Sequence, residues 1–238
     1  ELCKEIFKNL CSEEGYERFQ KQMEDDYGGF EEYHVAVFGE PGSDKPFEWV
    51  LTGRHNTMRA DGNSVAGVAF GGPIFYGHAA DGHFNEDPKH TNNVWWYQGQ
   101  QANAIFQTFD DKQKAKALIT KADPDAQESI RLRGAELESL DPGIKVAELD
   151  PQQKQMVQKL IKDLTLPFRA FDVEEVQSCL RDAGGVDPLR LTYSKEGDIG
   201  EDQVWDIWKL EGPAFSWYFH GSPHVHTWAH VGAPAAKG

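Results

Sequence analysis

The part of this chain best suited to chemistry is a strand-like run near its C-terminus, where one residue separates two histidines. His224 and His226 lie in the sequence Pro-His-Val-His-Thr-Trp, in a stretch of eleven residues that holds four of the nine histidines. Side chains alternate between the two faces of an extended chain, so these two imidazoles point the same way, about 7 Å apart along the strand. Imidazole is the commonest nitrogen ligand of zinc, copper and iron. The spacing therefore predicts half of a transition-metal site.

The other ligands must come from elsewhere, because a catalytic zinc or copper site takes three or four protein ligands. His55 is the first candidate, on a predicted strand with polar neighbours. His78 is the second, at the end of a strand that opens into a long polar loop over residues 79–93. His83 and His90 lie in that loop and are weaker candidates. The alternative for every one of these histidines is a packed ring whose nitrogens are satisfied by hydrogen bonds.

Two further residues have types that would serve a metal-dependent reaction. Glu86, in the same loop, is a candidate general base beside a metal-bound water, and the alternative is an exposed loop acid. Arg59 is a candidate clamp for a carboxylate or phosphate group of a substrate, and so is Arg54. The alternative for both arginines is a cross-strand ion pair. A third interpretation has no metal, and the histidines bind an acidic small molecule beside Arg59.

Hydrophobic periodicity divides the chain into regions that would position these residues. We expect one α+β domain over residues 1–238, with a helical segment at 1–28, strands at 33–78, helices at 94–183 and strands at 189–231. Strand regions that flank a helical region favour a single antiparallel sheet built from both ends of the chain, with the central helices packed on it. Such a sheet would bring His55 and His78 towards the C-terminal pair.

Several local signals mark the ends of these elements. Asp61-Gly62, between runs at 55–60 and 64–70, predicts a tight hairpin turn. Gly28-Gly29 is expected to end the first helical segment. Asp110, Asp150 and Asp172 are each expected to cap the start of a helix.

Composition excludes some classes of partner. The 238 residues carry a formal net charge of -15, which argues against nucleic acid and anionic membranes. No apolar run approaches the roughly 20 residues of a membrane-spanning helix. Cys3 and Cys11 are too far apart along one helix for a disulfide, but a bridge from either to Cys179 stays open, so the cysteines do not fix the compartment. The oligomeric state is not predicted.

Three sequence elements together resemble a known family. They are Gly53-Arg54-His55, then Gly72-Pro73-Ile74-Phe75, and the terminal run from Pro223 to Trp228. From about residue 33 onward the chain is similar to the secreted bacterial proteins grouped as domain of unknown function 3500. The resemblance implies a removed export signal and a secreted or periplasmic location, but no activity. The matching elements contain the histidines at 55, 224 and 226, and they do not support His220 or His230 as ligands.

These observations lead to one interpretation and one rival. We expect an exported protein that binds one transition-metal ion, copper or zinc, through His55, His224 and His226, with His78 as the candidate fourth ligand. The partner would be a small-molecule substrate, either hydrolysed by a metal-activated water or oxidised. The rival is a non-catalytic metal carrier, or a subunit that binds a partner protein.

Overall fold

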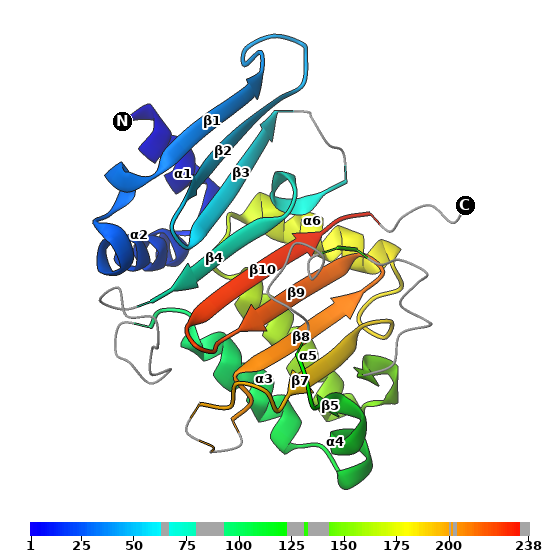
Figure 1. Ribbon diagram of the computed structural model, residues 1–238. Helices are drawn as coiled ribbons and strands as arrows, with labels where there is room; N and C mark the ends of the chain where they lie inside the picture. The colour runs from blue at the N-terminus through cyan, green and yellow to red at the C-terminus, as the bar shows by residue number, and fades with distance from the viewer. Residues whose placement is uncertain are drawn as a thin grey trace.

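One mostly antiparallel sheet runs through the molecule and takes its strands from both ends of the chain (Figure 1). The computed structural model describes residues 1–62, 67–79, 93–122, 131–132, 143–199, 201 and 204–233. Within this part of the chain the strand order is β1-β2-β3-β4-β10-β9-β8-β7-β5, and β6 pairs with β7. The N-terminal and C-terminal strands meet where β4 pairs with β10.

The strands fall into an N-terminal group, a C-terminal group and two short central strands. They are β1 (His34–Gly39), β2 (Phe47–Gly53), β3 (Asn56–Gly62), β4 (Ile74–His78), β5 (Leu118–Ile119), β6 (Ile144–Lys145), β7 (Arg190–Ser194), β8 (Ile207–Gly212), β9 (Phe215–His220) and β10 (Val225–Val231). The α-helices are α1 (Leu2–Leu10), α2 (Glu13–Tyr27), α3 (Trp96–Gln107), α4 (Asp111–Ala117), α5 (Pro151–Thr165) and α6 (Ala170–Asp182). Short 3-10 helices are η1 (Phe30–Glu32), η2 (Ala69–Gly71) and η6 (Val146–Glu148). The expected α+β class and the sheet built from both chain ends are confirmed.

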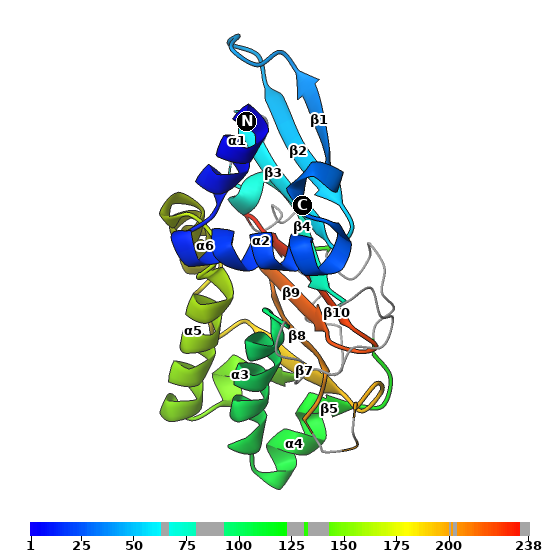
Figure 2. The same ribbon diagram turned by 90° about the vertical axis from the view of Figure 1, so that its left-hand side faces the viewer.

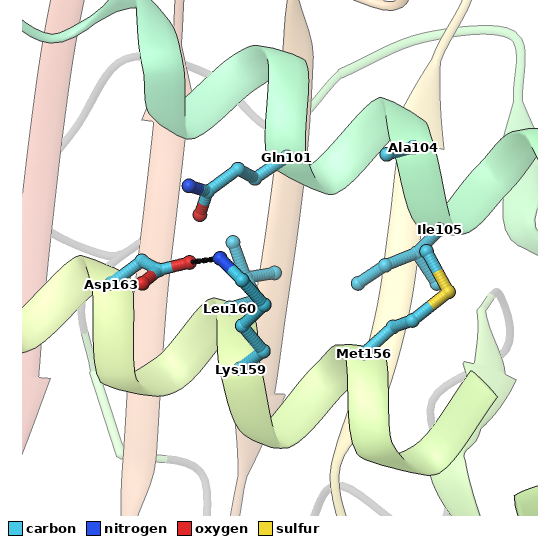
Figure 3. Close-up of a pocket in the computed structure, with 7 residues that line it drawn as sticks. All are labelled: Gln101, Ala104, Ile105, Met156, Lys159, Leu160 and Asp163. Carbon is cyan, nitrogen blue, oxygen red and sulfur yellow. Dashed lines mark hydrogen bonds and ion pairs between the residues drawn. The ribbon is translucent and has the colours of Figure 1, made fainter. Parts of the chain in front are cut away.

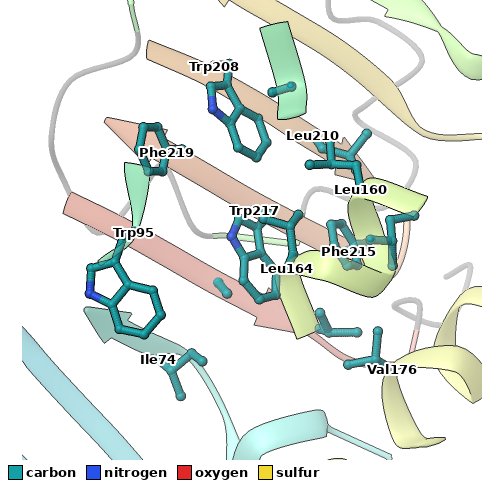
Figure 4. Packing of buried hydrophobic residues seen from close by; sticks show 14 of the residues in the cluster. Ile74, Trp95, Leu160, Leu164, Val176, Trp208, Leu210, Phe215, Trp217 and Phe219 are labelled. Carbon is teal, nitrogen blue, oxygen red and sulfur yellow. The ribbon is translucent and has the colours of Figure 1, made fainter. Parts of the chain in front are cut away.

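The helices lie on one face of the sheet (Figure 2). Buried aromatic and aliphatic side chains form the core between the two layers. Figure 4 shows Leu160 and Leu164 of α5 beside Trp217 and Phe215 of β9. Both aromatic rings are completely buried. Removing a buried ring of this size costs roughly 3–5 kcal/mol, so this layer contributes strongly to the position of the central strands.

The side chains of β10 alternate between the apolar core and the opposite face of the sheet, which carries the histidine cluster. Val225 and Ala229 are fully buried towards the helices, whereas His226 and Trp228 are partly exposed on the opposite face. Because successive side chains leave a strand on opposite sides, this pattern keeps the His226 imidazole out of the apolar core.

Two of the three expected helix caps are present. The side chains of Asp110 and Asp150 each accept a hydrogen bond from a backbone amide three residues later, at 2.8 Å. The expected cap at Asp172 is wrong, because α6 begins at Ala170 and Asp172 lies in its first turn. There its carboxylate accepts a bond from Arg169 Nε at 2.9 Å.

The first helical segment ends at Gly28 as expected, in a left-handed conformation, but it is two helices rather than one. Cys11 is extended and forms an isolated bridge with Phe168, and Ser12 then caps α2. Cys3, Cys11 and Cys179 are all free thiols. The region at 94–183 also differs from the expectation, since it contributes the short strands β5 and β6 to the sheet beside β7. None of the described helices has the length and apolar character needed to cross a bilayer.

The hairpin expected at Asp61-Gly62 is also wrong. Both residues belong to β3 and pair with Glu48 and Phe47 of β2. A Cβ atom on Gly62 would lie 1.9 Å from the Phe47 ring, so the glycine makes room for a cross-strand aromatic side chain instead of forming a turn. The chain actually reverses between β2 and β3 at Arg54-His55, and this turn places His55 in the candidate site.

Candidate metal centre

Three histidines from distant parts of the chain converge at the junction of β4 and β10. The Nε2 atoms of His55 and His226 lie 3.1 Å apart, and those of His224 and His226 lie 2.9 Å apart. One nitrogen from each ring falls within 4.8 Å of the other two. The sequence-based expectation that His55 joins the C-terminal pair agrees with this geometry.

His55 reaches this position from a strained turn. Its φ angle is 52°, a left-handed conformation that residues other than glycine seldom adopt. Its carbonyl oxygen accepts hydrogen bonds from Gln22 Nε2 at 2.7 Å and from the Gly77 amide at 2.9 Å. The indole of Trp95 in turn donates to Gln22 Oε1 at 3.1 Å. Such strain persists where the surroundings fix it, and here α2 and β4 both hold the turn.

The neighbouring carbonyl of the turn is fixed as well. The hydroxyl of Tyr33 donates to the carbonyl oxygen of Arg54. Burial, and then the nearby Asp26 carboxylate, raise the pKa of Tyr33 well above its usual value, so this hydroxyl remains a donor through the physiological pH range. Both residues of the turn are therefore anchored before any ligand binds.

The rings can approach one another because β4 carries a glycine beneath them. A Cβ atom on Gly77 would lie 3.3 Å from the Cδ2 atoms of both His55 and His226. It would also lie 2.2 Å from the carbonyl oxygen of Val225, closer than a real Cβ atom comes to backbone. The absence of a side chain at this position creates the cradle that the two imidazoles share.

A buried carboxylate fixes the orientation of the first histidine. Nδ1 of His55 makes a short contact with Oδ2 of Asp26, whose side chain is fully buried. Arg54 Nε donates to the other oxygen, Oδ1, at 3.0 Å. With the Nδ1 proton donated to Asp26, the lone pair of His55 Nε2 faces the other two histidines. Histidines that bind metals usually donate their second ring nitrogen to a carboxylate in this way.

Two of the separations in the cluster are close to those expected around a single small cation. Four ligands at the usual zinc–nitrogen distance of 2.0–2.1 Å lie about 3.3–3.4 Å from one another on a tetrahedron. The two short nitrogen–nitrogen distances, 2.9 and 3.1 Å, are close to this edge. His55 is 9% exposed and His224 is 7% exposed, so these two donors are largely shielded from water, whereas His226 is partly exposed. These three residues could hold one metal ion.

Aromatic rings border one side of the cluster. The His226 ring lies 5.5 Å from the ring centroids of both Phe75 and Trp228, and those two rings lie 5.3 Å from each other. Trp228 also stacks on Tyr218 of β9 at 5.6 Å. All four side chains project from the sheet face opposite the helices, so an apolar wall continues from the histidines along this face.

His78, the candidate fourth ligand, is not brought into the group. It follows Gly77 on β4, and since Gly77 faces the cluster, the next side chain points to the helical face. There the fully buried His78 has its Nε2 atom 3.7 Å from Oδ2 of Asp25 on α2. His83, His90 and the candidate base Glu86 lie outside the described residues.

Arg59 adopts the alternative arrangement, a cross-strand ion pair. Its guanidinium contacts the Glu48 carboxylate, and its Nε atom donates to the Pro73 carbonyl oxygen at 2.9 Å. A catalytic role for Arg59 stays a prediction. The arginine that contacts the cluster is Arg54, through Asp26. Sequence reasoning missed Asp26 and Gln22, because both lie in a charged, amphipathic helix whose polar residues look like ordinary solvent-facing ones.

The cavities on the helical side offer much less chemistry. One of about 150 Å³ lies between α3 and α5, lined mainly by apolar groups and closed at one end by the Lys159–Asp163 ion pair (Figure 3). None of its lining residues belongs to the histidine cluster. The candidate site of this protein is therefore the cluster itself.

The Asp26 contact gives a direct prediction. We expect Asp26→Asn to weaken metal binding by roughly 10–100-fold, because a neutral amide holds the His55 ring less firmly and makes its Nε2 a poorer donor. Competition titration with a chromophoric chelator measures the change. Asp25→Asn is the matched control, since this neighbouring carboxylate faces His78, and it should bind metal as the wild type does. Equal affinities for all three proteins would show that Asp26 does not support the cluster.

Comparisons with known proteins place the chain in a family without assigning an activity. Searches of curated proteins and of solved structures found no significant match. The model of one family, described as "Protein of unknown function (DUF3500)", matches residues 1–227. This match includes the β2–β3 turn, β4 and the His-x-His pair, so it spans every residue of the cluster. The chain therefore belongs to the family of proteins of unknown function designated DUF3500.

Proposed function

We propose that this protein is an exported metalloenzyme that binds one copper or zinc ion through His55, His224 and His226 and acts on a small-molecule substrate. The observation that carries the proposal is the convergence of three Nε2 atoms around a glycine cradle, with the first imidazole already oriented by a buried carboxylate. A packed but inert cluster would not need its ring nitrogens to face one another.

The number of ligands favours catalysis over transport. The described residues supply three protein nitrogens, and catalytic zinc sites typically use three protein ligands and leave the next position to water or substrate. A carrier would close its coordination with protein side chains. The partly exposed His226 and its aromatic neighbours Phe75 and Trp228 suit the approach of a small, largely apolar molecule.

The donor set also narrows the choice of metal. Three neutral imidazoles suit zinc and copper, whereas manganese, magnesium and calcium prefer oxygen ligands. When bound, zinc would supply an activated water for hydrolysis, and copper would supply one-electron chemistry for oxidation. In either case His55 is held in one tautomer by Asp26, and Phe75 and Trp228 provide apolar contacts beside His226. Glu86 remains our candidate for the general base.

Elemental analysis of protein purified without an affinity tag tests the proposal. We expect close to one equivalent of copper or zinc per chain, removed by a chelator and restored by adding the metal. Protein free of bound copper and zinc, which also fails to bind either on addition, would contradict the proposal.

A second measurement separates an enzyme from a carrier. Cobalt(II) in place of the native ion reports its ligands through its visible absorption spectrum. An open position should bind azide, and the spectrum should then shift, whereas a centre closed by protein ligands should not respond. An unresponsive spectrum would favour the metal carrier over the enzyme.

A further inference from the structure

Strand β1 forms an exposed and apolar edge of the sheet. It is the last strand at its end of the order, and no described strand pairs with its outer side. Its sequence is His-Val-Ala-Val-Phe-Gly, and every residue except Ala36 is exposed. Val37 is 50% exposed and Phe38 is 59% exposed, and these neighbours point to opposite faces. Apolar side chains are therefore open to water on both faces, next to backbone groups that can still accept a partner strand.

The opposite end of the sheet is very different. There β5 has only two residues and pairs with β7 in parallel, so little edge remains for pairing. Natural proteins protect longer edges with charged residues, prolines or bulges. β1 has none of these: its six residues include no Lys, Arg, Asp, Glu or Pro, and its register with β2 is unbroken from His34 to Gly39. An edge left in this state is suited to pairing.

We propose that β1 pairs in an antiparallel arrangement with β1 of a second copy of this chain, which joins two sheets into one across a two-fold axis. The outer backbone groups of an edge strand are complementary to another extended strand. Because β1 is apolar on both faces, its partner must also be apolar on both faces, and β1 itself meets this condition. A two-fold axis pairs the same surface with itself, as in most homodimers.

The charges at the two ends of β1 support a second copy as the partner. Before the strand, Lys4 Nζ lies 2.5 Å from Glu31 Oε1, and after it, Lys45 Nζ lies 2.7 Å from Glu40 Oε2. Antiparallel pairing puts the start of one strand beside the end of the other. Each Lys4–Glu31 pair would then face a Glu40–Lys45 pair, so acid and base occur on both sides. The exposed Glu32 and Asp44 add one acid at each end, so a lysine of one copy would face two acids of the other, although each chain carries a net charge of -15.

The size of the contact predicts its strength. One six-residue strand offers a small interface, below the range of stable complexes, so the dimer should form reversibly with concentration. Since the described strands present one such edge per chain, pairing should stop at two copies. None of the cluster histidines takes part, so the proposal does not depend on metal binding.

Analytical ultracentrifugation from about 1 to about 500 μM tests the proposal. We expect the wild-type mass to rise from one chain towards two. Val37→Lys and Phe38→Lys should remain monomeric to at least tenfold higher concentration, because each puts a charged side chain in place of an apolar one in the contact, near its own copy across the two-fold axis. Phe171→Lys on α6 is the matched control: its side chain is 60% exposed, and it should dimerise like the wild type.

Hydrogen exchange locates the contact independently. The backbone amides of residues 34–39 should be protected at high concentration and exchange freely at low concentration. A wild type that stays monomeric throughout would overturn the proposal. So would a dimer that survives both lysine substitutions with unchanged affinity, or an assembly that grows beyond two chains.

Discussion

Replacement of His226 by alanine is expected to abolish stable metal binding. Nε2 of His226 lies within 3.1 Å of the ligand atoms of both other histidines, so its loss leaves His55 and His224 as two donors separated by a gap. We expect the metal content to fall from about one equivalent to near zero, and the affinity to fall by more than the roughly 100-fold cost of losing a supporting residue. Elemental analysis after dialysis measures the first, and chelator competition measures the second.

The same variant should lose the stabilisation that metal provides. A ligand present at 100 times its dissociation constant stabilises a folded protein by about 2.7 kcal/mol, so added metal should raise the melting temperature of the wild type but not of His226→Ala. His34→Ala is the control, because this exposed histidine at the start of β1 lies outside the cluster. If His226→Ala retained its metal while folded, the cluster would not be the metal site.

Replacement of Gly77 by alanine should damage both the sheet and the site. The new Cβ atom would lie 2.2 Å from the Val225 carbonyl oxygen, which belongs to backbone and cannot rotate away. Strands β4 and β10 would have to separate, at a cost of about 1–3 kcal/mol or more. The same atom would crowd the rings of His55 and His226 at 3.3 Å, so metal affinity should fall even at temperatures where the variant is folded.

Thermal unfolding of the metal-free and metal-loaded forms separates these two effects. The control is Gly232→Ala, just after β10. An added Cβ atom there would lie 3.3 Å from the Leu132 side chain and 3.4 Å from the Val68 side chain, and its nearest backbone neighbour, the Gly67 carbonyl oxygen, is at an ordinary contact distance of 3.7 Å. That variant should lose less than about 1 kcal/mol and keep its metal. A Gly77→Ala protein as stable as this control, with unchanged affinity, would show that the cradle is not required.

Much of this arrangement can be predicted from local patterns. The period of two in the last strand predicts that His224 and His226 share a face, and strand regions at both ends of the chain favour one sheet that includes His55. Asp110 and Asp150 precede helices in sequences whose capping geometry depends only on residues three positions away. Such features involve short-range contacts, so they can be inferred without knowing the tertiary structure.

The support of the site could not be predicted in the same way. Asp26 and Gln22 contact His55 across 29 and 33 residues, and nothing in the sequence of α2 distinguishes them from solvent-facing polar residues. The turn at Arg54-His55 could not be predicted from the sequence either, for a similar reason. Asp61-Gly62 has the better local turn sequence, but tertiary contacts from α2, Tyr33 and β4 stabilise the left-handed conformation of His55 instead.

For His78, a shift of one position along the strand decides whether the side chain can reach the cluster. It lies at the strand end that borders the cluster, and sequence spacing alone does not reveal which face its side chain takes. Gly77 lies on the face of the two imidazoles, so the next side chain, His78, points to the opposite face. This follows only from the pairing of β4 with β10. His78, the candidate fourth ligand, therefore lies on the helical side of the sheet, beside Asp25.

The pairing of β4 with β10 also affects when the protein can acquire its ion. His55 and His226 are 171 residues apart, and they meet only after β4 has paired with β10, the last strand. A partly synthesised or unfolded chain offers only the His-x-His pair or an isolated imidazole, which hold metal weakly. If the chain is exported in an unfolded state, it would therefore cross the membrane empty. The metal supply of the destination compartment, rather than that of the cytoplasm, would then decide which ion is bound.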